Sequence, residues 1–128
     1  MLREGSDGVL LGFGSMVHPA LEAAELLAAQ GLEFRVVDMR WVKPLDDDAL
    51  VAAAQTPLVV TLEDGVIAGG AGEGVAGRLS ELGLEVPQLL LGIPDRFVAH
   101  GKPALLYEEL GLDGPGIAQA VLQKLQRS

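Results

Sequence analysis

The feature that most constrains the fold is an alternation of short apolar runs with longer helical patterns. Four runs have the length and the Val and Leu content of buried strands, at residues 9–11, 34–39, 58–62 and 86–91. Helical patterns separate or follow them, at residues 20–30, 46–55, 72–82, 103–110 and 115–126. Strands that are apolar throughout and joined by helices predict a mainly parallel sheet covered on both faces. The expected fold is therefore a three-layer α/β/α sandwich.

Proline and glycine mark the ends of these elements. Pro19 falls where the first turn of a helix tolerates proline, and Gly31 and Gly83 follow helical patterns as stop signals. No repeat or linker divides the chain, so residues 1–128 are interpreted as a single domain. Between the elements we expect a long turn over residues 63–70 and an irregular segment over residues 93–101.

Composition and charge exclude several classes of protein. Half of the 128 residues are hydrophobic (49%), which is too many for a disordered chain. The absence of Cys excludes disulfides, thiolate metal sites and cysteine nucleophiles. A net charge of −9 disfavours nucleic acid as a partner, because an acidic surface repels phosphates. With no apolar run long enough to span a membrane, a cytoplasmic domain is expected.

The turn after the first predicted strand carries Gly12 and Gly14, a pattern found in dinucleotide-binding turns. Asp38, at the end of the next strand, occupies the place of a ribose-binding acid. The third glycine of that motif is replaced by Val17. We therefore favour a simple strand-to-helix turn over a nucleotide site.

A second glycine cluster spans residues 69–74 and includes Gly69, Gly70 and Gly72. Its N–H groups suit an anion at a helix N-terminus, but the cluster lacks the Lys-Ser/Thr ending of a phosphate-binding loop. Glu73 also brings negative charge to the position of a phosphate. Close packing of the helix against another backbone is the favoured interpretation, with Gly70 and Gly72 at positions that a Cβ would disturb.

Three acids, Asp46, Asp47 and Asp48, begin the second predicted helix. Consecutive helical residues point about 100° apart, so these side chains do not converge on one metal ion. We interpret Asp46 as the N-cap, with its carboxylate accepting a backbone N–H of the first turn. His18, His100 and Ser15 lack the spacing of a catalytic triad or metal site. No catalytic, cofactor-binding or metal-binding residue is therefore assigned.

The segment after the fourth strand joins an aromatic side chain to a cation and an imidazole. Arg96, Phe97 and His100 are the candidates here for a boundary with another domain or subunit, because Phe and Arg are enriched in interfaces. The competing interpretations are a surface loop tied by an Asp95–Arg96 pair and a Phe97 that packs into the domain's own core.

Several motifs occur together in one order along the chain. They are Asp38-Met39-Arg40-Trp41-Val42-Lys43-Pro44-Leu45-Asp46, Leu62-Glu63-Asp64-Gly65, Gly69-Gly70-Ala71-Gly72, Gly92-Ile93-Pro94-Asp95-Arg96-Phe97-Val98, His100-Gly101 and Leu110-Gly111-Leu112-Asp113-Gly114. Together they resemble the C-terminal domain of the 1-deoxy-D-xylulose 5-phosphate synthases, a transketolase-like family, over nearly the whole chain. The Gly-Ile-Pro-Asp-Arg-Phe block narrows the match to the synthases, while Ala99 departs from the acidic residue expected there.

The resemblance implies a mixed five-stranded sheet with one antiparallel strand. It also implies that thiamine diphosphate and Mg are bound by two larger domains of a longer dimeric enzyme, and that this chain alone is non-catalytic and binds neither. That enzyme joins pyruvate to glyceraldehyde 3-phosphate with loss of CO2, supplying isoprenoid, thiamine and pyridoxal synthesis.

Two alternatives to this function stay open. The transketolase-type motifs also occur in the β subunits of 2-oxoacid dehydrogenases, whose equivalent domain has the same fold and glycine cluster. The turns at Gly12 and Gly69 are also compatible with a stand-alone nucleotide- or phosphate-binding module. Thiamine-binding domains encoded upstream of Met1 would favour the synthase.

Overall fold

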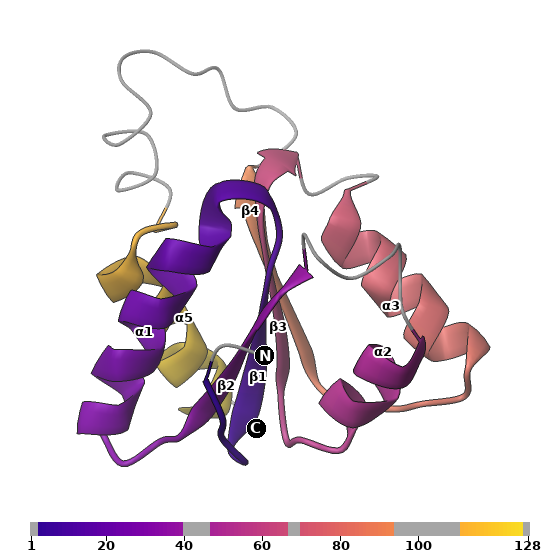
Figure 1. Cartoon of the computed structure of the whole chain (residues 1–128), viewed down its shortest axis with the longest axis horizontal. Coiled ribbons are helices and arrows are strands. Elements are labelled where there is room, and N and C mark those ends of the chain that lie inside the picture. Colours follow the sequence, from indigo (N-terminus) through magenta and orange to yellow (C-terminus); the bar gives the residue numbers. More distant parts are fainter. Residues whose placement is uncertain (1–2, 40–46, 67–69, 94–110, 127–128) are drawn as a thin grey trace.

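The fold is a parallel sheet between two layers of helices (Figure 1). The computed structural model describes residues 3–39, 47–66, 70–93 and 111–126. Its four strands lie in the order β2-β1-β3-β4, and every neighbouring pair is parallel. The strands are β1 (Gly8–Gly12), β2 (Phe34–Asp38), β3 (Val59–Val66) and β4 (Gln88–Ile93).

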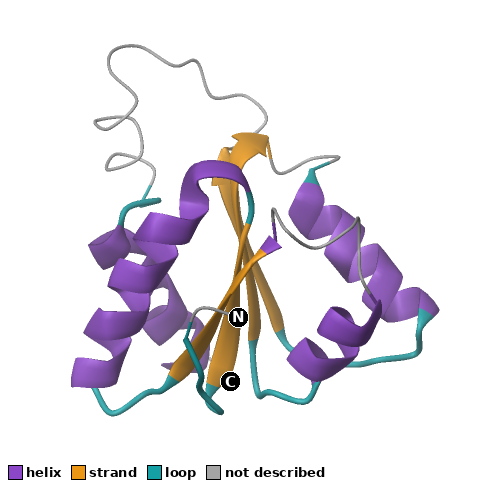
Figure 2. Ribbon diagram, viewed as in Figure 1, coloured by secondary structure: helices purple, strands orange, loops and turns teal. Residues whose placement is uncertain are grey.

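The helices cover both faces of this sheet (Figure 2). They are the short 3-10 helix η1 (Gly14–Met16) and the α-helices α1 (Val17–Ala29), α2 (Asp47–Ala54), α3 (Ala71–Glu81) and α5 (Gly114–Gln126). Helices α1 and α5 pack on one face, and α2 and α3 pack on the other. The predicted three-layer sandwich is confirmed.

Alternate side chains of the inner strands β1 and β3 belong to different cores, one on each face of the sheet. In β1, Leu10 packs with α1 and α5, whereas Val9 and Leu11 pack with α2 and α3. In β3, Val60 faces α1 and Val59 faces α3. Because successive side chains of a strand point to opposite faces, strands that are apolar at every position fill both cores.

The strand order reverses between β1 and β3. From β1 the chain crosses through α1 to β2 on one side, and from β3 it crosses through α3 to β4 on the other. In open α/β sheets, the carboxyl ends of the two strands at such a switch point are where ligands bind. Any ligand site of this fold is therefore expected beside the ends of β1 and β3.

Strand β3 is longer than the sequence indicated. The predicted turn over residues 63–70 was wrong in its first half, because β3 continues to Val66 and pairs there with Ile93 of β4. Leu62 pairs with Leu91, so three residues of β3 lie opposite one residue of β4 in this interval. The arrangement is a β-bulge, which bends a strand and redirects its side chains.

Helix ends agree with the sequence signals. Gly31 and Gly83 follow α1 and α3 with φ angles of 84° and 72°, a region that favours glycine. Helix α1 begins at Val17, earlier than predicted, and β4 begins one residue after Pro87. The helix predicted over residues 103–110 and most of the segment over residues 93–101 lie outside the described residues.

The sheet has one antiparallel addition at the β2 edge. Arg3 and Val36 form an isolated antiparallel bridge beside the four parallel strands. The sheet formed by the described residues has four parallel strands, and this bridge is the antiparallel pairing found beside them, so the five-stranded sheet that the resemblance implies stays a prediction. In the part of the chain that the structure describes, no helix is long and apolar enough to cross a membrane.

Candidate functional site

The candidate site lies at the switch point, where the first turn (residues 12–15) and the start of α3 flank the bulge of β3. Both features were identified in the sequence as candidate anion-binding turns. Consecutive bulge residues, Glu63 and Asp64, each reach one of them. Their side chains leave β3 toward opposite faces of the sheet, as successive strand residues do.

Asp64 closes the first turn. Its Oδ2 accepts hydrogen bonds from the backbone N–H of Ser15 at 3.0 Å and from the Ser15 hydroxyl at 2.9 Å. Gly14 has φ 63°, and a Cβ there would lie 2.6 Å from Asp64 Oδ2. Gly14 is thus required both by its backbone conformation and by the approach of the carboxylate. The favoured interpretation of a tight strand-to-helix turn agrees with this geometry.

Glu63 closes the start of α3. Its Oε1 accepts the N–H of Ala71 at 3.1 Å and its Oε2 accepts the N–H of Gly72 at 2.9 Å. The N-cap residue, Gly70, makes no side-chain cap. Glu63 therefore supplies from β3 the acceptor that α3 lacks locally, and its negative charge lies at the positive end of the helix dipole. It does so with only 4% of its surface exposed.

Gly72 is the glycine that this arrangement needs. A Cβ at this position would lie 2.5 Å from Thr61 Oγ1 and 3.0 Å from Leu90 Cγ. The sequence favoured close packing of this helix against another backbone, whereas the atoms nearest to Gly72 belong to the side chains of Thr61, Leu90 and Glu63. Gly70 differs, because its φ of −89° is open to any residue. Gly69 lies outside the described residues.

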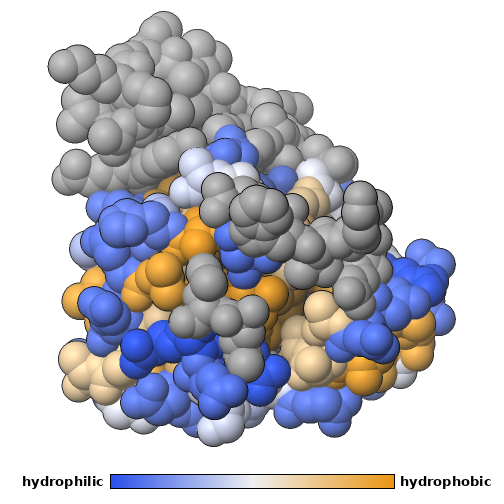
Figure 3. All heavy atoms as spheres, in the orientation of Figure 1, coloured by the Kyte–Doolittle hydropathy of each residue, from blue (hydrophilic) through white to orange (hydrophobic). Residues whose placement is uncertain are grey.

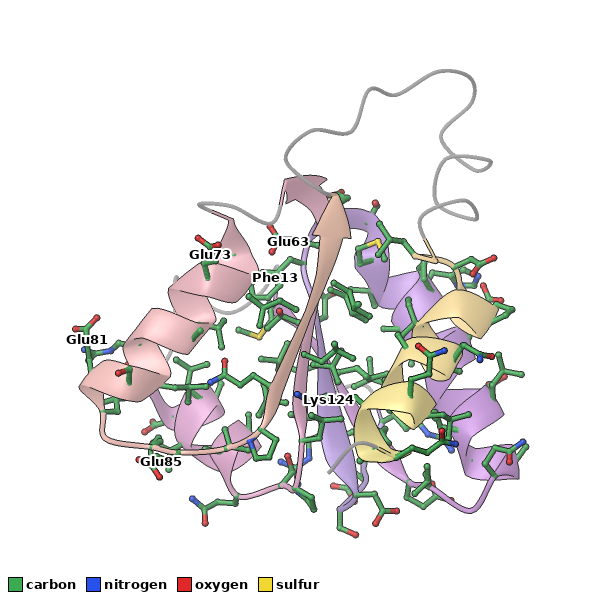
Figure 4. The ribbon with its side chains drawn as sticks, turned by 180° about the vertical axis from the view of Figure 1, so that it is seen from behind. Phe13, Glu63, Glu73, Glu81, Glu85 and Lys124 are labelled. Carbon is green, nitrogen blue, oxygen red and sulfur yellow. The ribbon has the colours of Figure 1, made fainter. Side chains whose placement is uncertain are left out.

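Three N–H groups of these turns already have acidic acceptors. The N–H of Ser15 donates to Asp64 and those of Ala71 and Gly72 donate to Glu63, and the two carboxylates would repel a phosphate placed beside them. In Figure 4, Glu63 lies between the strands and the first turn of α3, whereas Glu73 projects from the helix toward solvent. The buried acid at this helix end is therefore Glu63, where the sequence had pointed to Glu73.

Asp47 has a partner that the sequence did not reveal. Arg78 of α3 donates from Nε to Asp47 Oδ1 at 2.9 Å and from Nη2 to Oδ2 at 2.7 Å. The Arg78 hydrogen bonds lower the pKa of Asp47 below its ordinary value, and the Arg78 charge acts in the same direction. The ion pair joins α2 to α3. Asp46, the predicted cap, lies outside the described residues.

The remaining candidates from the sequence do not join this site. His18 is on the exposed side of α1, with Nε2 3.4 Å from Glu22 Oε1. Among the described residues, no three His, Cys, Asp or Glu side chains are grouped as metal ligands. Arg96, Phe97 and His100 lie outside the described residues, so their role at a boundary stays a prediction.

Comparisons with known proteins agree on one family. The family described as "Transketolase, C-terminal domain" matches residues 1–117. A 1-deoxy-D-xylulose-5-phosphate synthase of Chromobacterium violaceum is 50% identical over 124 residues, which are 96% of this chain and 19% of the relative. The synthase of Thiobacillus denitrificans is 51% identical, over 96% of this chain and 19% of its own length. The chain thus spans about a fifth of the length of these relatives.

Solved structures give the same result. The structure titled "Split gene transketolase, inactive beta4 tetramer" matches 98% of this chain and 41% of its own, with 40% identity and a TM-score of 0.87. A transketolase of Campylobacter jejuni, 20% identical, matches 94% of this chain and 17% of its own with a TM-score of 0.64, which supports the fold alone.

Proposed function

The chain belongs to the transketolase C-terminal domain family, and on this premise we propose that it is the structural C-terminal domain of a 1-deoxy-D-xylulose 5-phosphate synthase. The complete enzyme would join pyruvate to glyceraldehyde 3-phosphate, with loss of CO2, for isoprenoid precursor synthesis. Relatives of that name that align with nearly the whole chain support the proposal.

One observation about this chain supports the proposal that it has a structural and not a catalytic role. At the switch point, where a ligand of this fold is expected, the N–H groups of Ser15, Ala71 and Gly72 donate to Asp64 and Glu63. Each of these carboxylates holds a turn of the domain together. The domain therefore uses its ligand-binding position for its own stability.

The proposal extends to the cofactor, the partners and the location of the complete enzyme. Thiamine diphosphate and Mg would be held by the other domains of the enzyme, which would be a homodimer in the cytoplasm. Neither group is assigned to a residue of this chain. Its contribution would be assembly with those domains, through a surface that includes Arg96, Phe97 and His100.

Turnover measurements test the proposal. The chain alone, given pyruvate, glyceraldehyde 3-phosphate, thiamine diphosphate and Mg, is expected to form no deoxyxylulose phosphate. The complete enzyme is expected to form it, and Phe97→Asp is expected to weaken the assembly of that enzyme while the isolated domain keeps its melting temperature. Product from the chain alone would refute the structural role, and unfolding of the isolated variant would place Phe97 in the core.

Calorimetric titration tests the alternative of a phosphate-binding module. Nucleotides and sugar phosphates at millimolar concentration are expected to give flat isotherms, because the two turns are closed by acids. Saturable heat that disappears in a Gly14→Ala variant would instead favour the binding module. The remaining alternative, a 2-oxoacid dehydrogenase β subunit, predicts decarboxylation of a 2-oxoacid without aldehyde acceptor by the complete enzyme.

A further inference from the structure

A pocket of about 440 Å³ lies beside the first residues of β2, at the end of the sheet opposite the switch point. Its lining residues are Glu4, Gly5, Ser6, Glu33 and Arg35. Figure 3 shows hydrophilic residues gathered on the face where residues 3–7 run in front of β2. The proposed function uses none of these residues, so the pocket is a separate feature of the domain.

The walls of this pocket are fixed by the backbone. The N–H of Val36 donates to the carbonyl of Arg3 at 2.9 Å. The N–H of Asp7 donates to the carbonyl of Glu33 at 2.9 Å, and the N–H of Glu33 donates to Asp7 Oδ2 at 2.7 Å. Between these bonds the chain approaches β2 so closely that a Cβ at Gly5 would overlap the carbonyl of Glu33. The shape of the pocket is therefore set before any ligand arrives.

Arg35 lines this pocket without a partner of its own. Its Nε–H is buried and donates to no acceptor in the part of the chain that the structure describes. The Nε of Arg3 is likewise unbonded, but the Arg3 guanidinium reaches Glu33 Oε2 through Nη2 at 3.4 Å. A shielded N–H without an acceptor is unfavourable, and a guanidinium forms its strongest hydrogen bonds with carboxylates. Arg35 therefore favours a ligand that brings a carboxylate.

Acidic and basic side chains line the same pocket without neutralising each other. Among the described residues, Arg35 forms no ion pair with Glu4 or with Glu33. Both carboxylates belong to exposed residues, and the nearest cation to Glu33 is Arg3 at 3.4 Å. A simple anion would be repelled by the two acids, and a simple cation would be repelled by Arg35. A ligand that carries both charges is attracted by both walls.

We propose that this pocket binds a small amino acid in its zwitterionic form. The ligand carboxylate bonds to the guanidinium of Arg35, and the ammonium group lies beside Glu4 and Glu33, with the Ser6 hydroxyl as a further hydrogen-bonding group. The volume lies within the range of about 300 to 1,000 Å³ that is typical of small-molecule sites. Because the acids are open to water, the dissociation constant is expected in the millimolar range. The inference goes beyond the proposed function, since the synthase reaction contains no amino acid.

Nuclear magnetic resonance titration of the 128-residue chain tests the site with three matched probes. β-Alanine carries both charges, propionate is the same carbon chain without the ammonium group, and propylamine has a methyl group in place of the carboxylate. Only β-alanine is expected to shift the Nε–H resonance of Arg35 and the backbone resonances of residues 4–6 in a saturable way. Raising the salt concentration is expected to weaken this binding, because it screens both charge pairs.

Three variants show which side chains hold the ligand. Arg35→Gln is expected to raise the dissociation constant of β-alanine about tenfold, because it removes the charged donors of the carboxylate. Glu4→Gln is expected to raise it about threefold, since an exposed ion pair contributes less. Glu25→Gln removes one exposed acid of α1 and is the matched control, with no change expected. Melting curves check the folding of each variant, and Glu4→Gln, outside the four strands, keeps the test available if Arg35→Gln does not fold.

The outcomes are distinct. The proposal is overturned if β-alanine gives no saturable shift, or if propionate binds as tightly as β-alanine. It is also overturned if Glu25→Gln weakens binding as much as Glu4→Gln, because the effect would then follow the net charge of the chain and not the pocket. None of these results bears on the synthase assignment, which the turnover measurement tests separately.

Discussion

The two turns at the switch point are closed by the same kind of hydrogen bond, one turn in a buried and the other in an exposed position. In each, a carboxylate from the bulge of β3 accepts hydrogen bonds from backbone N–H groups beside a glycine. Glu63 is buried against α3 and bonds only to backbone, whereas Asp64 is exposed and shares its bonds between the backbone and the hydroxyl of Ser15. Because water can replace the partners of an exposed group but not those of a buried one, the α3 turn is expected to be the more sensitive.

The largest effect is expected from Gly72→Val. A branched side chain at this position meets Thr61 and Leu90 and separates Glu63 from the start of α3. We expect the free energy of unfolding to fall by about 3 kcal/mol, as measured by urea denaturation. Gly77→Ala is the matched control on the same helix, because a Cβ there meets nothing within 4 Å. Equal losses in the two variants would contradict the packing of Gly72.

Glu63→Ala is expected to follow, with a loss of about 2 kcal/mol, because it leaves buried N–H groups of α3 without their acceptor. Glu63→Gln keeps the shape and one acceptor oxygen and should lose less. Urea denaturation of both variants measures the difference. An unchanged stability in Glu63→Ala would mean that the N–H groups of Ala71 and Gly72 find other acceptors.

Asp64→Ala is expected to cost about 1 kcal/mol, half of the loss at Glu63, since water reaches the first turn. The same denaturation series provides the measurement. If Asp64→Ala lowered the free energy of unfolding as much as Glu63→Ala does, the expected difference in sensitivity between the buried and the exposed turn would be contradicted.

Gly77→Ala is expected to have the smallest effect, and that effect is stabilising. Alanine is a better helix former than glycine by about 1 kcal/mol, and position 77 has room for its Cβ. A melting temperature slightly above that of the wild type is the expected result. Destabilisation would contradict the open space around position 77.

Acid titration separates the Asp47–Arg78 pair from both turns. The pKa of Asp47 is lowered in the folded state, so the pair stabilises the protein above the ordinary carboxyl pKa of 3.8 and loses this contribution as the pH falls through the lowered value. Asp47→Asn should therefore be less stable than the wild type at neutral pH, and the two stabilities should converge in acid. Denaturation curves recorded from about pH 7 to about pH 2 measure this convergence, and a constant difference would contradict it.

Most of the fold could be predicted because it depends on local patterns. The apolar runs and the glycine stops identify the strands and the ends of α1 and α3. The length of β3 could not be predicted in this way, since Glu63, Asp64 and Gly65 have the composition of a turn and form a bulge between Leu62 and Val66, both of which pair with β4. The partner strand overrides the local preference.

The site was predictable only in part, because its halves are distant in sequence. The glycines predict tight turns, but the hydrogen-bond acceptor of Ser15 lies 49 residues away, at Asp64. Arg78 is similarly 31 residues from Asp47. A single sequence shows which backbone and charged groups need a hydrogen-bond partner, but it does not show which distant residue supplies that partner. The acids that follow the apolar run of β3, Glu63 and Asp64, were predicted only as the beginning of a turn.

The position of α5 has a consequence for how the chain acquires its structure. Ile117 and Val121 of this helix belong to the same core cluster as Leu10 and Ala20, so the layer begun by α1 is completed by residues from the other end of the chain. Contacts between such distant segments form slowly, because a long loop must close first. During synthesis, the α1 side of the sheet is therefore covered by α1 alone until α5 has left the ribosome, whereas α2 and α3 can already complete the opposite layer.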